Sequence, residues 1–425
     1  MGCPLLTHRL TPFSSPRKRL PDVSVIPLQM SQPRWSLRVV SLRGLNRWRA
    51  ALAAALLLWL CPRDTRAQGQ WGYKFQTWQE ENGRIRVDSH YALAERDLGV
   101  ATKLKVTGLV DTISGASPTG QPAATPGAPI PVATLTDRRK AWSLDLSHVF
   151  AVTTVALGYA NSRESDYISD GWSVNTRTEF NEKNTTVLVG YARVDDDITA
   201  RFLPAPQTKT GDDVVVGVTQ LLNPRTSFSV NVTRGVARGY LSDPYKIIRK
   251  NTELFPGLSL PLTFPENRPN RREKWIVFSG VNLAVPEMHG ALDGSYRVYR
   301  DDYGIRSHTV ELAWFQSIGE RLIVRPAARY YRQGAADFYR LSLDGSAIVP
   351  GSFTTGRAPF FSADYRLSDM DTATIGLKVI WTVRPEQLTI DATLERYTMR
   401  GRDGKTPVDA YADANVLTVG ANLSW

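Results

Sequence analysis

The chain has 425 residues, of which 42% are hydrophobic and 22% are charged, and only two of them are cysteines. This composition excludes a collagen, a coiled coil, a disulfide-rich scaffold and a disordered chain. The formal net charge of +11 suggests a nucleic-acid-binding protein, but residues 1–67 hold 11 basic residues against two acids. The rest of the chain is therefore nearly neutral, and we expect no nucleic acid among its partners.

The first 67 residues have the pattern of an export signal. Arginines up to Arg49 precede an unbroken apolar run at 50–60, and residues 65–67 form a small-residue cleavage site. This order is typical of a cleaved secretory signal peptide. The apolar run is also shorter than the roughly 20 residues that a transmembrane helix needs. We expect cleavage before Gln68, with Met30 as a possible true start of the chain.

Cleavage there divides the chain into a leader, 1–67, and one domain, 68–425. Both cysteines, Cys3 and Cys61, lie in the leader. Disulfides therefore cannot hold the domain together, and its stability must come from packing and hydrogen bonds.

After the leader, apolar and polar side chains alternate along the sequence, which is the pattern of strands with two different faces. The clearest cases are 142–147, 292–298, 308–314, 388–395 and 417–425. A soluble β-sandwich also alternates. These strands, however, are longer than the five or six residues usual in soluble sheets. Aromatic residues also gather near the strand ends, as in the interfacial girdles of membrane barrels: Trp71, Tyr73, Trp78, Tyr159, Trp172, Tyr191, Trp275, Tyr299, Tyr330, Tyr331 and Trp381.

Links between the strands alternate between short and long up to residue 331, as a barrel with short turns at one end requires. To keep both ends of the domain on the same, periplasmic side, the segment 336–344 must count as a further strand. The sequence thus predicts an all-β fold, a single transmembrane antiparallel up-and-down barrel with 18 strands. A count of 16 is the alternative, because the links between 332 and 370 do not alternate between short and long.

Hydrocarbon cannot satisfy backbone polar groups, so a membrane-spanning sheet must close, with apolar residues outside and polar residues allowed inside. The predicted inward face is strongly charged with both signs, which suggests salt bridges across a narrow, wet lumen. The candidate lumen-lining residues are Asp145, Asp293, Arg297, Glu311, Arg321, Arg325, Arg329, Asp391 and Glu395, together with Arg84, Arg86 and Asp88. Arg321, Arg325 and Arg329 share one strand face and are expected to form a positive ladder.

The chain ends in the segment 418–425, TVGANLSW. It resembles the C-terminal sorting signal of bacterial outer-membrane barrels at every position of that pattern. The resemblance implies that the barrel assembly machinery recognises this strand. We expect Thr418, Gly420, Leu423 and Trp425 to carry the signal.

A second resemblance covers nearly the whole domain and consists of five ordered blocks: ISGASPTG (113–120), GYLSDPY (239–245), YRDDYGI (299–305), RYYRQ (329–333) and DYRLS (364–368). These blocks resemble the bacterial family catalogued as domain of unknown function 3570. The resemblance implies an outer-membrane-type barrel and leaves the activity open.

The sequence offers little support for catalysis or for a metal site. Ser307 and His308 are adjacent, so on a strand their side chains point to opposite faces. The acidic runs 195–197, 212–213 and 301–302 are candidate calcium ligands, but such acids are more often paired or solvated. Four histidines after the leader show no metal-ligand spacing. We expect no enzyme activity, no cofactor and no metal.

The sequence therefore favours a non-enzymatic protein of the bacterial outer membrane, a porin-like channel or a docking component for an envelope assembly. Its expected partners are the outer-membrane lipid bilayer and the barrel assembly machinery, with an unknown solute or envelope partner. Two alternatives remain. One is an outer-membrane barrel enzyme of the lipase or protease type, and the other is a secreted soluble β protein that binds glycans.

Overall fold

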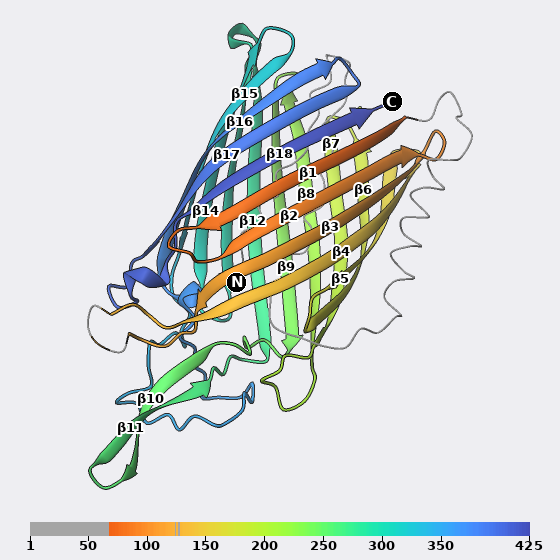
Figure 1. The fold of residues 1–425 in the computed structure, drawn as a ribbon. Helices are drawn as coiled ribbons and strands as arrows, with labels where there is room; N and C mark the ends of the chain where they lie inside the picture. The colour runs from red at the N-terminus through yellow and green to blue at the C-terminus, as the bar shows by residue number, and fades with distance from the viewer. Residues whose placement is uncertain (1–67, 124, 126–127) are drawn as a thin grey trace.

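The computed structural model describes residues 68–123, 125 and 128–425. The predicted signal peptide and both cysteines lie outside these residues. Sixteen antiparallel strands form a closed barrel, with β1 paired to β18 (Figure 1). The wall strands are β1 (Gly69–Glu80), β2 (Arg86–Asp97), β3 (Thr102–Pro118), β4 (Val132–Phe150), β5 (Thr153–Arg163), β6 (Tyr167–Phe180), β7 (Thr185–Ile198), β8 (Gln207–Asn223), β9 (Thr226–Gly239), β12 (Arg271–Val285), β13 (Gly290–Asp301), β14 (Arg306–Ile318), β15 (Leu322–Gln333), β16 (Met370–Arg384), β17 (Leu388–Gly401) and β18 (Ala414–Ser424).

Five smaller elements lie between the wall strands. Strands β10 (Ile247–Phe255) and β11 (Leu258–Pro265) pair only with each other. They form a hairpin that projects from the end of the barrel opposite the C terminus (Figure 1). Three short 3₁₀ helices are η1 (Pro286–Met288), η2 (Tyr365–Leu367) and η3 (Val408–Ala410). Within the described residues, no helix is long and apolar enough to cross a membrane.

The fold class is confirmed, and the strand count is 16, the lower of the two predicted numbers. The segment 336–344 is not a wall strand. Its backbone bonds to a neighbouring part of the same long loop instead, since Ala336 N–H donates to Leu367 O at 2.8 Å and Arg340 N–H donates to Ser362 O at 2.9 Å. Without this strand, 334–369 becomes one long loop at the same end of the barrel as 240–270 and 402–413.

The two faces of the wall follow the predicted alternation. On β18, Leu417, Val419 and Leu423 are 40–47% exposed on the outside of the barrel, whereas Thr418 is 4% exposed on the inside. Outward aromatic residues are also exposed, including Trp71, Tyr73, Tyr159, Trp172, Trp275, Tyr330 and Trp381. Trp78 is an exception, because it is 5% exposed and packs inside the barrel against Tyr397.

Candidate functional site

Eight of the nine candidate lumen residues lie on wall strands, on the face opposite the exposed apolar side chains. They are Asp145 on β4, Asp293 and Arg297 on β13, Glu311 on β14, Arg325 and Arg329 on β15, and Asp391 and Glu395 on β17. The ninth, Arg321, lies in the exposed turn before β15. The three-arginine ladder is therefore wrong, and only Arg325 and Arg329 remain on one strand face.

The additional prediction for β2 was also wrong. Arg86 and Asp88 pair with each other at 3.0 Å. They lie on the outward face, which they share with exposed His90 and Ala92. Arg84 lies in the turn between β1 and β2, where it donates hydrogen bonds to Asp409 O and Ala410 O. Arg86 and Asp88 follow the alternation of β2, but the sequence analysis assigned the two faces of this strand the wrong way round.

Inside the barrel, acids and bases from adjacent strands meet. The Lys378 ammonium on β16 lies 3.2 Å from the Asp391 carboxylate on β17, and both side chains are nearly fully buried. Glu311 and Arg329 are direct neighbours in the register of β14 and β15. The Arg325 guanidinium lies 5.0 Å from the centre of the Phe315 ring. The sequence reading missed Lys378, although its alternation on β16 places it on the inward face.

The terminal strand closes the barrel. Trp425 and Gly69 exchange two backbone hydrogen bonds of 3.1 Å, and the Trp425 ring covers the α-carbon of Gly69. Gln76 on β1 donates a side-chain hydrogen bond of 3.0 Å to Thr418. A β-carbon at Gly420 would lie 3.0 Å from a carboxylate oxygen of Asp391. The four predicted signal residues thus lie on the seam of the barrel, and their recognition by an assembly machinery stays a prediction.

The long loops fold together over one mouth of the barrel. We call the residues 240–270, 334–369 and 402–413 the cap. Tyr365, Ala410 and Tyr411 of the cap pack against inward residues of the wall, in a cluster that includes Trp78, Tyr397, Met399 and Val416. Because these wall residues face the lumen, the loops turn inward over the mouth instead of standing away from it.

Loop 334–369 joins opposite parts of the cap. Phe338 and Leu367 pack with Tyr303 and Ile305 from the turn between β13 and β14. Leu343 and Phe361 pack with Ile248 of the hairpin, and Leu343 is fully buried. Loop 334–369 also contacts the loop between β17 and β18, where the Tyr339 hydroxyl lies 2.7 Å from the Thr406 hydroxyl.

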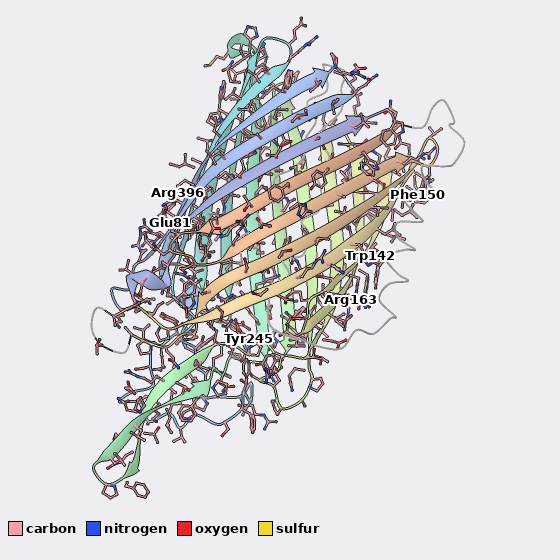
Figure 2. The ribbon with its side chains drawn as sticks, in the orientation of Figure 1. Glu81, Trp142, Phe150, Arg163, Tyr245 and Arg396 are labelled. Carbon is pink, nitrogen blue, oxygen red and sulfur yellow. The ribbon has the colours of Figure 1, made fainter. Side chains whose placement is uncertain are left out.

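The cap also bonds to the opposite part of the rim. Ile247 N–H donates to Thr119 O at 3.1 Å, and the fully buried Lys246 donates to Pro118 O. These contacts join the loop after β9 to the loop before β4, and strands β5, β6, β7 and β8 separate the two in the wall. Tyr245, labelled at this end of the barrel in Figure 2, also donates to Asp166 in the loop after β5. The cap therefore spans the mouth.

A buried cluster of charges lies inside the cap. Arg268 pairs with Glu266 at 2.7 Å and with Asp364 at 2.8 Å. Arg366 pairs with Asp364 and lies 2.8 Å from Asp243. Glu266 is fully buried and Asp364 is 1% exposed. Burial raises the pKa of Glu266 to about 7, although the neighbouring Arg268 opposes this shift. Charges buried this deeply are stable only when every partner stays in place.

The five sequence blocks meet in this cap. Asp243 of the second block pairs with Arg366 of the fifth. Gln333 of the fourth block donates hydrogen bonds to Arg366 O and Ser368 O. The first block supplies Pro118 O as an acceptor for Lys246.

The third block joins the cap through the turn between β13 and β14. Tyr303 is buried there, and its hydroxyl donates to Pro269 O at 2.9 Å. Asp301 pairs with Arg272 at 2.5 Å. The blocks therefore either belong to the cap or contact it, which the sequence order alone did not indicate.

The residues considered for catalysis or calcium binding have ordinary surroundings. Ser307 is 4% exposed and faces the lumen, whereas His308 is exposed on the outside and contacts the Tyr296 hydroxyl. Asp195 pairs with Arg193 and Asp196 pairs with Lys209, both at 2.9 Å. Among the residues that the structure describes, no group of acids, histidines and cysteines is placed to hold a metal ion.

Comparison with solved structures returns barrels of low sequence identity. A bacterial polysaccharide outer membrane secretin is 9% identical, with 84% of this chain and 97% of that chain covered and a TM-score of 0.45. A loop L8 deletion mutant of OmpT, an outer membrane protein of Vibrio cholerae, is 8% identical, with coverages of 84% and 99% and a TM-score of 0.41. OccK8 (OprE) of Pseudomonas aeruginosa is 7% identical, with coverages of 85% and 98% and a TM-score of 0.39.

Sequence comparison adds a family but no characterised relative. No curated protein matches the chain. The family described as "Protein of unknown function (DUF3570)" matches residues 50–418. This range includes all five blocks and leaves out the last seven residues of the chain, 419–425. The chain belongs to this DUF3570 family.

Proposed function

We propose that this protein is a non-enzymatic β-barrel of the bacterial outer membrane, and that it works as a channel whose outer mouth is closed by its own cap. The exposed apolar side chains of the wall suit a hydrocarbon environment, which the free surface of a soluble protein does not offer. The termini lie at the end with short turns, so the cap faces outward if the barrel follows the usual orientation.

The observation that carries this proposal is the path of loop 334–369 across the mouth. Its two ends are close together, because Gln333 and Met370 are register partners on adjacent strands. A short link would therefore suffice to connect β15 to β16. The chain instead uses a long segment that buries apolar residues and paired charges over the lumen. Such a segment serves to obstruct the mouth, and its displacement would open a polar path.

Planar bilayer recordings test the channel. We expect small or rare currents from the full-length mature protein, and larger, frequent currents when residues 336–366 are replaced by a short Gly-Ser linker. The matched control replaces 253–260, the tip of the projecting hairpin, and should leave the currents unchanged. An absence of added current in a linker variant that still shows heat-modifiable gel mobility would overturn the channel proposal.

Location and catalysis have separate tests. Membrane fractionation should place the protein in the outer membrane, and recovery in the soluble periplasmic or extracellular fraction would favour the secreted glycan-binding alternative. Purified folded protein should show no esterase or protease turnover. Measurable turnover would favour an outer-membrane enzyme.

A docking role is the second candidate, and the hairpin β10–β11 favours it. Phe255, Leu258, Leu260 and Leu262 are 36–68% exposed on a part that projects beyond the barrel. Exposed apolar patches of this kind mark protein contacts. A photo-crosslinking residue at Leu260 should capture a defined envelope protein in cells if docking is the role, whereas a site on β6 should not.

A further inference from the structure

Three arginines on neighbouring strands point outward near the capped end of the barrel. Arg300 lies on β13, Arg306 on β14 and Arg332 on β15, and all three side chains are exposed. They share the outward face with Tyr296, Val310 and Tyr330, which are 42–48% exposed. We call Arg300, Arg306 and Arg332 the arginine triad.

The register brings the triad together. Arg300 and Arg306 are direct cross-strand partners, so their backbones lie about 5 Å apart. Arg332 is the partner of His308, which places it diagonally beside Arg306 at about 7–8 Å. Guanidinium groups on side chains of this length can converge on one small anion.

Arg300 and Arg306 have no acidic cross-strand partner, whereas Arg332 is the register partner of Asp371 on β16, which pairs with Arg402 at 3.0 Å. None of the triad's three members forms an ion pair with any residue of the described ranges 68–123, 125 and 128–425, and like charges directly opposite on a sheet are destabilising. Some other outward arginines at this end of the barrel have acidic partners. Arg193 lies 2.9 Å from Asp195 and 3.3 Å from Asp212. Arg396 lies beside Glu81 at 2.6 Å, and Figure 2 labels this pair.

The triad also has a defined height relative to the apolar wall. Along β14, outward residues run from Leu312 through Val310 and His308 to Arg306, that is, from apolar to cationic. Val310 is flanked in register by Tyr296 and Tyr330, so these aromatic rings lie one outward position from Arg332 and two outward positions from Arg300 and Arg306. Tyrosines prefer the membrane–water interface. The cations therefore lie at the level of lipid headgroups, on the side of the membrane that the cap faces.

We propose that the arginine triad binds the phosphate of a phosphorylated glycolipid in the outer leaflet, with the acyl chains of the lipid lying on the apolar wall below. Arginine presents several N–H donors in a rigid fork that matches phosphate geometry, and charge-assisted hydrogen bonds to phosphate are strong. A bound phosphate would neutralise the repulsion between Arg300 and Arg306. This inference rests on the outer-membrane location proposed above.

A lipid suits the position better than a soluble anion. A free phosphate gains only the contacts to the guanidinium groups, and these are exposed and screened by salt. A lipid adds burial of its chains against Val310, Leu312 and the two tyrosines, which are continuous with the triad. The site therefore combines a charged head region with an apolar surface directly beneath it.

Native mass spectrometry of the folded protein in detergent tests the site with three probes: a bisphosphorylated lipid A, the same lipid without phosphates, and inorganic phosphate. The triple variant Arg300→Gln, Arg306→Gln and Arg332→Gln should bind the bisphosphorylated lipid roughly tenfold more weakly than the wild type. Arg193→Gln is the matched control, because it removes an outward arginine that already has acidic partners, and it should bind like the wild type.

The outcomes are distinct. Phosphate-dependent lipid binding that the triple variant loses and the control keeps supports the site. Equal binding of both lipids, unchanged binding by the triple variant, or full competition by inorganic phosphate at the same phosphate concentration would each overturn it. Arg306→Gln alone serves if the triple variant loses heat-modifiable mobility. Recovery of the wild-type protein outside the outer membrane would instead overturn the proposed function.

Discussion

Arg268 and Asp364 form an ion pair of 2.8 Å in the cap, although 96 residues separate them in the chain. The pair joins the loop before β12 to the loop before β16, and both side chains are almost fully buried. Because Asp364 also pairs with Arg366, one carboxylate connects two buried guanidinium groups. A single substitution of Asp364 should therefore weaken the contacts that hold the cap together.

Asp364→Asn should loosen the cap and leave the barrel intact. Removing one partner of a buried pair leaves uncompensated charge, which costs about 3–5 kcal/mol. We expect faster cleavage of the cap loops by added protease and larger currents in bilayers, with heat-modifiable mobility unchanged. Asp302→Asn is the control, because its pair with Arg271 is exposed, and such pairs are worth about 0–1 kcal/mol. Equal effects of the two substitutions would contradict the role of the buried cluster.

The cap should also open more readily as the pH rises. Burial raises the pKa of Glu266 to about 7 from an ordinary value of 4.5. Between these values the closed cap holds a proton that the open cap releases, so this contribution to closure is present at low pH and is lost as the pH rises through about 7. Protease cleavage of the cap should therefore be faster at pH 8 than at pH 5.5.

Glu266→Gln provides the check on this assignment. Glutamine keeps the shape and does not titrate, so the difference in cleavage between the two pH values should shrink. The charged neighbours Arg268, Asp243 and Asp364, and Arg366, which pairs with the two aspartates, stay in place in this variant. An undiminished pH difference in the variant would assign the effect to one of these neighbours.

A positive charge on the outward wall should be costly. Leu312 is 50% exposed on the outside of β14, so Leu312→Lys should destabilise the barrel by about 2–4 kcal/mol near the membrane midplane. Ser295→Lys is the matched change on the inward face, where its register partner is Glu311, and it should cost much less. Urea unfolding in lipid vesicles measures both, and equal costs would mean that the two faces are wrongly assigned.

Trp425→Ala should impair assembly of the barrel. The Trp425 ring covers Gly69, and its backbone closes the sheet to β1. We expect a lower level in the outer membrane and more degradation in the periplasm, as measured by fractionation and immunoblotting. Ser424→Ala changes the neighbouring residue without removing an aromatic ring and should assemble normally. Normal outer-membrane levels of the Trp425 variant would count against the sorting signal.

The charge of the lumen should set ion preference once the cap is open. Arg325 lies on the inward face, opposite Lys378 in the register of β15 and β16. In the background of the 336–366 linker variant, Arg325→Glu should therefore shift the reversal potential in a salt gradient toward cation preference. Arg321→Glu is the control, since Arg321 lies in the turn and not on the strand. An unchanged reversal potential in the Arg325 variant would mean that this side chain does not face the ion path.

The faces of most wall strands could be predicted from the sequence because alternation is a local property, although Arg86 and Asp88 on β2 face outward and not inward as predicted. On β18, Thr418 faces inward and Leu423 outward, as the residue spacing predicted, since consecutive side chains on a strand point to opposite faces. The closed barrel itself followed from the same pattern, repeated along the domain.

Only the tertiary structure decided the strand count, the cap and the arginine triad. Residues 336–344 join no wall strand, because their backbone N–H groups donate to Leu367 and Ser362 of the same loop, to Tyr303 of the turn between β13 and β14, and to Arg249 of the hairpin. Arg366 and Asp243 meet although 123 residues separate them, and nothing local to either residue predicts the other. Arg300 and Arg306 become neighbours only through the register of β13 and β14. Each of these features is a long-range pairing, and its energy depends on partners that no short stretch of sequence contains.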